Sequence, residues 1–148
     1  GSSVHALLLD AYAYMEGRID PPSSLLRMGV DDLAAKARDE IPILAFEGGS
    51  LVGCAFVDVR NDCVYVSKLA VAARMRRRGV ARRIFDAVDA LAREQGKPCI
   101  ELETRIELFE NHETFAALGF RRTAERAHAG YERPTFVAMR RAVEATAE

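Results

Sequence analysis

The sequence predicts a single α/β domain with a mixed, mostly antiparallel, twisted sheet flanked by helices. Two observations predict this class. A strand, an amphipathic helix and another strand follow one another between residues 64 and 104, which implies a parallel pair with a right-handed crossover. Short turns separate the remaining strand-like segments, as between antiparallel neighbours. A chain of 148 residues with 49% hydrophobic residues can bury one core, so residues 1–148 are expected to form one domain.

The first half of the chain predicts two helices and then a three-stranded meander. Apolar residues recur at helical spacing over residues 5–15, until Asp20-Pro21-Pro22 makes a rigid turn. A second short helix is expected over residues 31–37, with Asp31 or Asp32 as its cap. The meander is expected to consist of residues 41–46, 51–59 and 64–71, with a tight hairpin at Gly48-Gly49.

The second half predicts a helix, a strand, a shorter helix and a final antiparallel pair. The first helix begins at Val80 and ends near Gly96, and its apolar spacing leaves Arg82, Arg83, Asp86 and Asp89 outside. Residues 99–104 alternate as a strand. Residues 110–118 read as a helix with Phe109, Phe115 and Leu118 facing inward, and Gly119 ends it. Residues 120–127 and 135–143 are expected to form the final pair.

An arginine cluster lies where the strand ending at Val71 leads into the helix that begins at Val80. Six arginines occur between positions 74 and 83, namely Arg74, Arg76, Arg77, Arg78, Arg82 and Arg83. Cations destabilise a helix N-terminus by roughly 0.3 to 1 kcal/mol, so the pattern favours a bound anion. Gly79 has no Cβ and lets a ligand approach the free N–H groups of the first turn. The junction therefore predicts a phosphate or pyrophosphate cradle.

The junction lacks the spacing of the dinucleotide fingerprint and of the Walker loop. Instead, Arg76-x-x-Gly79-x-Ala81 resembles the coenzyme A signature of the GCN5-related N-acetyltransferases (GNAT), Arg/Gln-x-x-Gly-x-Gly/Ala. The strand before it, the helix after it and Leu118-Gly119-Phe120 occur in the order that this family uses. The resemblance covers about residues 43–141. The family usually opens with a strand before the first helix; none is visible here, so it is either missing or trimmed.

The resemblance implies the GNAT fold, in which the two parallel strands splay apart and the pantetheine of acetyl-CoA pairs with the free strand edge. It implies acetyl-CoA as co-substrate and a primary amine, on a small molecule or a protein, as acceptor. The cofactor-binding residues that it implies, together with the arginine cluster, are Leu69, Ala70, Val71, Arg76, Arg77, Arg78, Gly79, Val80, Ala81, Arg82, Asn111 and Phe115. Relatives commonly carry a tyrosine at the position of Phe115, where its hydroxyl protonates the leaving thiolate.

The acceptor amine must lose a proton before it attacks, so a carboxylate base is useful. Glu101 and Glu103 share one face of their strand, and we expect Glu103 to act in catalysis and Glu101 to contact the acceptor. A solvated sheet face explains the same pattern. Tyr131 is the candidate acid in place of the missing tyrosine. Lys68 is unsuited to be a conventional base without a large fall in its pKa.

Two loops are expected to border the acceptor. In the resembled family the loop between the first two helices has this place, which makes Tyr14, Arg18, Asp20, Ser23 and Ser24 candidate acceptor contacts. The connector from His128 to Pro134 is longer and more polar than a hairpin needs. Ordinary surface turns account for both segments equally well.

The overall composition argues against nucleic-acid binding, membrane association and metal binding. The chain has 21 basic and 22 acidic residues, so no nucleic-acid or membrane partner is expected. Three cysteines and no membrane-length apolar run predict a cytoplasmic protein with free thiols, and no Cys/His spacing predicts a metal site. A non-catalytic acyl-CoA sensor remains an alternative to the enzyme, and a homodimer is possible by analogy.

Overall fold

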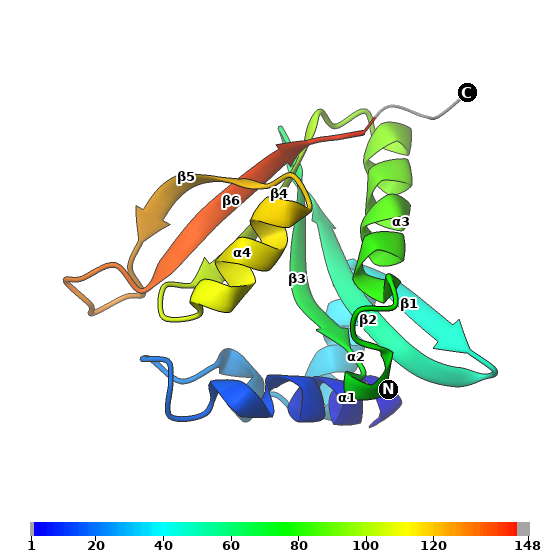
Figure 1. The fold of residues 1–148 in the computed structure, drawn as a ribbon, viewed down its shortest axis with the longest axis horizontal. Helices are drawn as coiled ribbons and strands as arrows, with labels where there is room; N and C mark the ends of the chain where they lie inside the picture. The colour runs from blue at the N-terminus through cyan, green and yellow to red at the C-terminus, as the bar shows by residue number, and fades with distance from the viewer. Residues whose placement is uncertain (1, 145–148) are drawn as a thin grey trace.

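The computed structural model describes residues 2–144, which form a divided six-stranded sheet with helices on both faces (Figure 1). The helices of this part of the chain are α1 (Ser2–Tyr12), α2 (Val30–Asp39), α3 (Val80–Glu94) and α4 (Phe109–Ala117), with the short 3-10 helices η1 (Ala13–Met15), η2 (Ser24–Arg27) and η3 (Ala73–Met75). The strands are β1 (Ile41–Glu47), β2 (Ser50–Val59), β3 (Val64–Val71), β4 (Cys99–Arg105), β5 (Arg121–Arg126) and β6 (Phe136–Ala142).

The strand order is β1-β2-β3-β4-β6-β5, and only β3 and β4 are parallel neighbours within residues 2–144. This confirms the predicted mixed, mostly antiparallel sheet and the crossover through α3. The β1–β2 hairpin turns at Gly48 and Gly49, whose φ angles are 56° and 82°. Glycine adopts such values far more readily than any other residue. In this part of the chain no strand precedes α1.

The parallel pair is short. It joins Val64 to Ile100, Tyr65 to Glu101 and Val66 to Leu102, and it stops there. Beyond this point, among the described strands, β3 pairs only with β2, while β4 pairs only with β6. Figure 1 shows the sheet dividing between β3 and β4 as a result.

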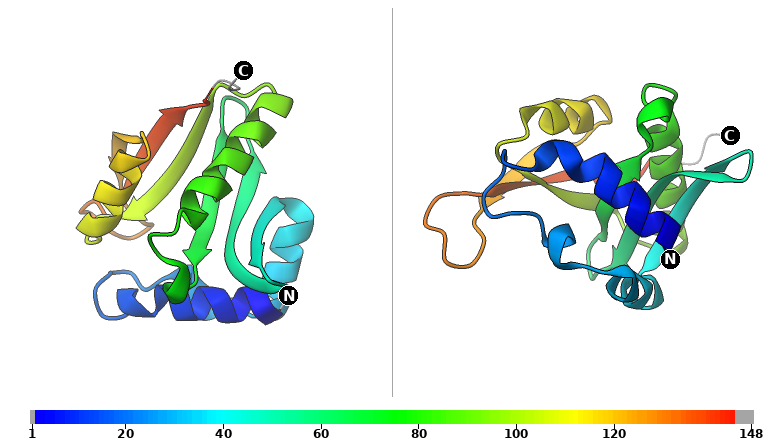
Figure 2. Two further views of the ribbon diagram at one scale, coloured as in Figure 1. Left: turned by 45° about the vertical axis from the view of Figure 1, so that its right-hand side comes forward. Right: turned by 90° about the horizontal axis from the view of Figure 1, so that it is seen from below.

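Two apolar clusters hold the helices on opposite faces. On one face α3 packs on the meander through Val80, Ile84 and Val88, and Phe115 of α4 joins the same cluster. On the other face Leu8 of α1 and Leu33 of α2 cover Cys54, Phe56 and Ala70. The two views in Figure 2 show α3 lying along the strands and α1 crossing below their ends. Both clusters stabilise the end of the sheet at which β3 and β4 separate.

Three local predictions were wrong. Asp32 does not precede α2 but lies inside its first turn, where it accepts a hydrogen bond from the N–H of the N-cap residue Gly29 at 2.8 Å. Phe109 is 67% exposed, because the helical repeat places it on a different face of α4 from Phe115. Asp89 is only 2% exposed. It lies one turn beyond the buried Phe85 and accepts a hydrogen bond from Arg141 at 3.0 Å.

No helix in the described part of the chain is long and apolar enough to cross a membrane.

Candidate active site

The anion cradle is built from two backbone reversals before α3. Gly79 is the N-cap of α3 at φ +79°, and no side chain caps the helix. Arg77 also adopts a left-handed conformation, with φ +64°. This conformation costs energy for a residue with a Cβ. The N–H groups of the first turn have no intrahelical acceptor, and such a terminus is suited to bind an anion.

The charges around this terminus have one sign. The first turn of α3 contains no acidic residue. Of the six arginines at positions 74 to 83, only Arg74 forms an ion pair within residues 2–144, with Glu47 at 3.8 Å. The other five are exposed, and Arg76, Arg77 and Arg82 among them line the cleft described next. A dianion such as a pyrophosphate would be stabilised here both by guanidinium groups and by the helix dipole.

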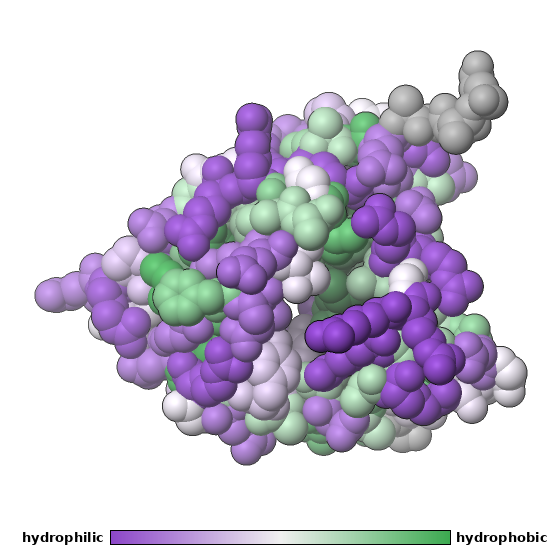
Figure 3. Space-filling view, viewed as in Figure 1, coloured by the Kyte–Doolittle hydropathy of each residue, from purple (hydrophilic) through white to green (hydrophobic). Residues whose placement is uncertain are grey.

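A continuous cleft of about 1200 Å³ runs from the cradle into the gap between β3 and β4. Residues 67–71 of β3 line one wall, and their edge toward β4 has no strand partner. Free backbone groups of this kind pair with an extended ligand as another strand would. In Figure 3 the hollow lies between α4 and the start of α3, with hydrophilic residues along its α3 side.

Most of the residues selected from the sequence line this cleft. They are Tyr14, Arg18, Ser23, Ser24, Leu69, Ala70, Val71, Arg76, Arg77, Gly79, Val80, Ala81, Arg82, Glu103, Asn111 and Phe115, and His128 of the polar connector joins them. Other selected residues do not line it, namely Asp20, Arg78, Glu101 and Tyr131.

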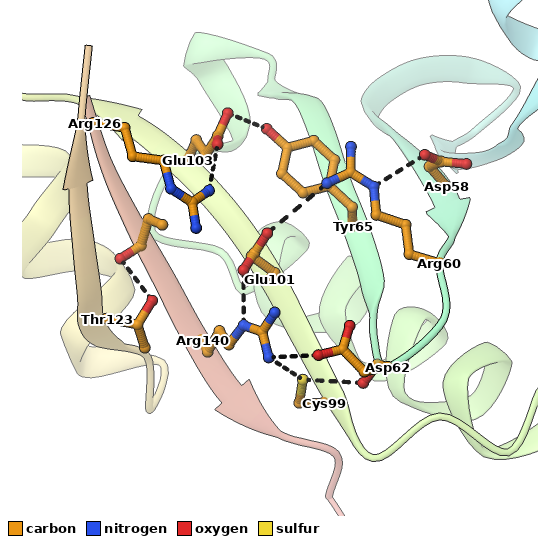
Figure 4. Close-up of polar contacts among 11 residues, drawn as sticks. Asp58, Arg60, Asp62, Tyr65, Cys99, Glu101, Glu103, Thr123, Arg126 and Arg140 are labelled. Atoms are coloured by element: carbon orange, nitrogen blue, oxygen red, sulfur yellow. Dashed lines mark hydrogen bonds and ion pairs between the residues drawn. The ribbon is translucent and has the colours of Figure 1, made fainter. Parts of the chain in front are cut away.

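Glu103 and Tyr65 form a hydrogen-bonded pair on the cleft wall. Tyr65 Oη donates to Glu103 Oε1 at 2.8 Å, and Arg126 Nη1 lies 3.6 Å from Glu103 Oε2 (Figure 4). Burial and the hydrogen bond to Glu103 raise the pKa of Tyr65, so the phenol stays protonated and donates. The Glu103 side chain is 30% exposed and can reach a ligand or water in the cleft.

Glu101 lies two residues earlier on the same face but has a different environment. It is 4% exposed and accepts a hydrogen bond from Arg140 Nε at 2.7 Å, while Arg60 Nη1 lies 3.9 Å away (Figure 4). Arg140 also donates to Asp62 at 3.1 Å, and these two hydrogen bonds raise its pKa. The carboxylate of Glu101 is thus enclosed by cations of the sheet face and does not contribute to the cleft.

Tyr131 is bonded to the turn after η1. Its hydroxyl donates to Asp20 Oδ1 at 2.7 Å, and Arg133 Nη2 donates to Asp20 Oδ2 at 2.9 Å. The hydrogen bond to Asp20 raises the pKa of Tyr131. Neither Tyr131 nor Asp20 lines the cleft. The connector between β5 and β6 therefore holds this turn, and its tyrosine hydroxyl is engaged outside the cleft.

Two contacts join the segment after α1 to α4 across the mouth of the cleft. Asn111 Nδ2 donates to Tyr14 Oη at 2.9 Å. Arg18 donates to both carboxylate oxygens of Glu110, at 2.7 and 2.9 Å. This charge-assisted pairing lowers the pKa of Glu110 to about 2. The residues expected to read the acceptor and those expected to hold the cofactor are thus physically connected.

The structure adds cleft residues that the sequence reasoning did not assign to the site, chiefly Tyr65, Ser67, Lys68 and Arg105. Two signals could have found some of them. Lys68 is the one charged residue of its strand and follows the polar Ser67 in a largely apolar segment. Arg105 stands at the carboxyl end of a parallel strand, where α/β sheets usually bind ligands.

A splayed parallel pair that opens onto an uncapped, arginine-rich helix N-terminus defines an α/β protein built to bind an extended ligand with an anionic end. A protein-family model described as the acetyltransferase (GNAT) family matches residues 3–120. The chain belongs to this family, which confirms the resemblance noted in the sequence.

Solved structures agree on the fold. An aminoglycoside 6'-N-acetyltransferase complexed with coenzyme A aligns with 99% of this chain and 92% of its own, at a TM-score of 0.73 and 14% identity. Ard1 from Thermoplasma volcanium aligns with 95% of this chain and 94% of its own, at a TM-score of 0.68 and 22% identity. The ribosomal-protein-S18-alanine N-acetyltransferase of Escherichia coli aligns with 95% of this chain and 90% of its own, at a TM-score of 0.67 and 17% identity. A comparison with curated protein sequences found no significant match.

Proposed function

We propose that this protein transfers the acetyl group of acetyl-CoA to a primary amine by direct attack of the amine on the thioester. The observation that carries the proposal is the continuity of the cleft from the arginine cradle to the free edge of β3 and on to Glu103. The cradle suits the pyrophosphate, and the free edge of residues 67–71 suits the amide groups of pantetheine. This arrangement brings the thioester to the end of the cleft near Glu103.

Positioning supplies much of the rate enhancement, because fixing two reactants in reactive geometry is worth roughly 7 to 11 kcal/mol. The amine must also lose a proton, since a lysine-type amine is neutral only about once in 2500 molecules at pH 7. Glu103 accepts this proton directly or through one water, while Tyr65 orients its carboxylate. Glu101 is not part of the proposal, because Arg140 and Arg60 already neutralise it.

The leaving thiolate needs no tyrosine at position 115. With a pKa of about 8.5 for its thiol, the thiolate is a tolerable leaving group, and solvent can protonate it. Phe115 instead packs edge-to-face against Phe85 and Phe120, with ring centroids 6.3 and 6.1 Å away. Tyr131 is not assigned as the acid, because its hydroxyl is bonded to Asp20 outside the cleft.

The second candidate is an acyl-CoA sensor without catalysis, which the phenylalanine at position 115 favours. Calorimetry with acetyl-CoA and continuous detection of free thiol with a panel of amines distinguish the two. The enzyme binds acetyl-CoA and releases thiol only when a suitable amine is present. A sensor binds acetyl-CoA with no release for any amine, and absence of binding would refute both candidates.

A further inference from the structure

Lys68 occupies the position in β3 where the strand is distorted. Ala55 of β2 faces two residues of β3, which is a β-bulge. At this bulge Lys68 has φ +54°. A left-handed conformation is costly for lysine and is typical of residues held in place at functional sites. The Lys68 side chain reaches the start of η2, where its Nζ donates to Ser24 Oγ at 3.0 Å, and both residues line the cleft.

The Lys68 ammonium group has no carboxylate partner within residues 2–144, in contrast to Lys36 and Arg18. Lys36 pairs with Glu40 at 2.8 Å, and Arg18 pairs with Glu110. Arg105, which also lines the cleft, is held by the carbonyl oxygens of Pro21 and Pro22. Burial lowers the pKa of Lys68, the nearby charges of Lys36, Arg105 and Arg27 lower it further, and Glu40 opposes this shift in part. A half-buried cation among other cations is stabilised by an anion.

Hydrogen-bonding capacity remains beside this ammonium group. Ser24 accepts only one of its three N–H bonds. The hydroxyl of Ser67, the preceding residue in β3, is buried and has no partner among the described residues, although Ser67 lines the cleft. The two N–H bonds of Lys68 that Ser24 does not accept can therefore bind an oxyanion in the cleft.

A polycationic acceptor fits this end of the cleft poorly. The carboxylates among the lining residues are Glu103 and Glu110. Glu110 is neutralised by Arg18, and Glu103 has Tyr65 and Arg126 beside it. After Glu103 has served the reacting amine, no free carboxylate among the described lining residues is left to bind a second ammonium group. The shortage of free carboxylates at this end of the cleft therefore favours an acceptor that carries a negative charge.

We propose that the acceptor is an amine that also carries a negatively charged group, a carboxylate or a phosphate, and that Lys68 with Ser24 binds this group. The proposal rests on the proposed acetyl transfer and specifies its acceptor. Lys68 is thus a specificity-determining residue, and the reaction itself remains transfer of acetyl from sulfur to the amine nitrogen.

Matched acceptors that share one amine test this inference. We would compare C-terminally amidated Gly-Glu with Gly-Gln, and Gly-phosphoserine with Gly-Ser, at saturating acetyl-CoA. The wild-type kcat/KM is expected to favour the anionic member of at least one pair by about tenfold or more, the effect of one charge-assisted hydrogen bond. The two pairs distinguish carboxylate from phosphate recognition.

Three variants separate recognition from other roles. Lys68→Met keeps the unbranched stem and the backbone strain, and it is expected to reduce the preference to about twofold, mainly by raising KM for the anionic acceptor. Lys68→Arg should retain the preference. Lys97→Met removes a comparably half-buried lysine that donates to the Asn61 carbonyl, and it should change nothing.

Two results would overturn the inference while leaving acetyl transfer intact: equal kcat/KM for both members of each pair, or an equal fall in kcat for both members in Lys68→Met. Acetyl-CoA binding without turnover of any amine would instead refute the proposed enzyme, and the acceptor assignment with it.

Discussion

Gly79 is the residue on which the anion site depends most directly. Its φ of +79° shapes the start of α3, and a Cβ there would meet no heavy atom within 4 Å. A side chain at this position would therefore displace no other protein atom, and Gly79 lines the cleft, where such a side chain can meet a bound anion. Shape and charge can be tested separately here, because asparagine and aspartate are nearly isosteric and both tolerate left-handed backbone.

Gly79→Asp is expected to weaken coenzyme A binding by about three orders of magnitude, since two unit charges about 4 Å apart repel by roughly 4 kcal/mol at an effective dielectric constant of about 20. Gly79→Asn should cost less than about tenfold by the same electrostatic argument, because it adds no charge. Calorimetric titration measures both. Equal losses in the two variants would show that space, and not charge, controls the site.

Glu101 and Glu103 provide a second matched pair at the residue scale. Glu103→Gln is expected to lower kcat by roughly 10²- to 10⁴-fold, the usual contribution of a general base. Glu101→Gln should leave kcat nearly unchanged and lower the free energy of unfolding by about 1 to 3 kcal/mol, because Arg140 loses a charge-assisted hydrogen bond. Initial rates and urea unfolding of both variants check this. A comparable loss of kcat in the two variants would contradict the assignment of the base.

At the scale of elements, a buried ion pair joins α3 to β6. Asp89 is 2% exposed, and Arg141 contacts it at 3.0 Å with a side chain only 9% exposed. The Arg141 guanidinium carbon also lies 5.3 Å from the ring centroid of Phe120. The pair connects the helix that begins at the cradle to the strand beside β4, on the far side of the divided sheet.

Arg141→Met is expected to lower the free energy of unfolding by about 3 to 5 kcal/mol, because Asp89 would then be a buried charge without its partner. The double variant Asp89→Asn with Arg141→Met should recover part of this loss, since it removes the uncompensated charge. Urea unfolding at pH 7 measures each variant. A single-variant loss under about 1 kcal/mol, the range of exposed ion pairs, would show that water reaches the pair.

The pairing of the strands also explains how the cleft forms. Backbone pairing between β3 and β4 ends at Val66 and Leu102, and β4 continues with β6 while β3 continues with β2. The bulge at Lys68 increases the local twist of β3. Separation of the two strands leaves one free edge, and packing of α1 and α3 on opposite faces supports the distorted strand.

At the scale of the whole molecule, burial decides which thiols react. Cys54 and Cys63 are 0% and 1% exposed, and burial raises the pKa of each to about 11. At pH 8 only about one in a thousand of such thiols is ionised. Cys99 is half-buried at the start of β4.

We therefore expect a thiol-specific chromogenic reagent at pH 8 to modify Cys99 alone in the folded protein, and all three cysteines in urea. Cys99→Ser should leave the folded protein unreactive, which would remove the protein's background from the thiol-release measurement. A second thiol that reacts at the rate of Cys99 without denaturant would show that the structure around one of the buried cysteines opens readily.

Much of the architecture follows from local pattern. The apolar run of residues 51–59, the Gly48-Gly49 turn and the helical period from Val80 each lie within a short window, so they predicted their elements closely. The arginine cluster could also be recognised in the sequence, because its arginines and Gly79 are consecutive or nearly so. These features depend on near neighbours and need no knowledge of distant contacts.

The roles of individual polar residues depended on partners far away in the chain. The alternation of the strand places Glu101 and Glu103 on the same face and does not distinguish them. In the structure Arg140 donates a hydrogen bond to Glu101, whereas Tyr65 donates one to Glu103. The period of α3 predicted an exposed Asp89, and only the fold brings Arg141 opposite it. The pattern also offered no sign that Tyr131 would be bonded to Asp20, 111 positions earlier.

The order of the elements, the crossover and the arginine cluster at the start of α3 could be read from the sequence alone, because periodicity and turn residues act over a few positions. Only the tertiary structure decided which carboxylate faces the cleft, where β3 and β4 part, and that Lys68 stands there without a carboxylate partner among the described residues. The reason is physical: burial and ion pairing are properties of the space around a side chain, and residues from several elements fill that space.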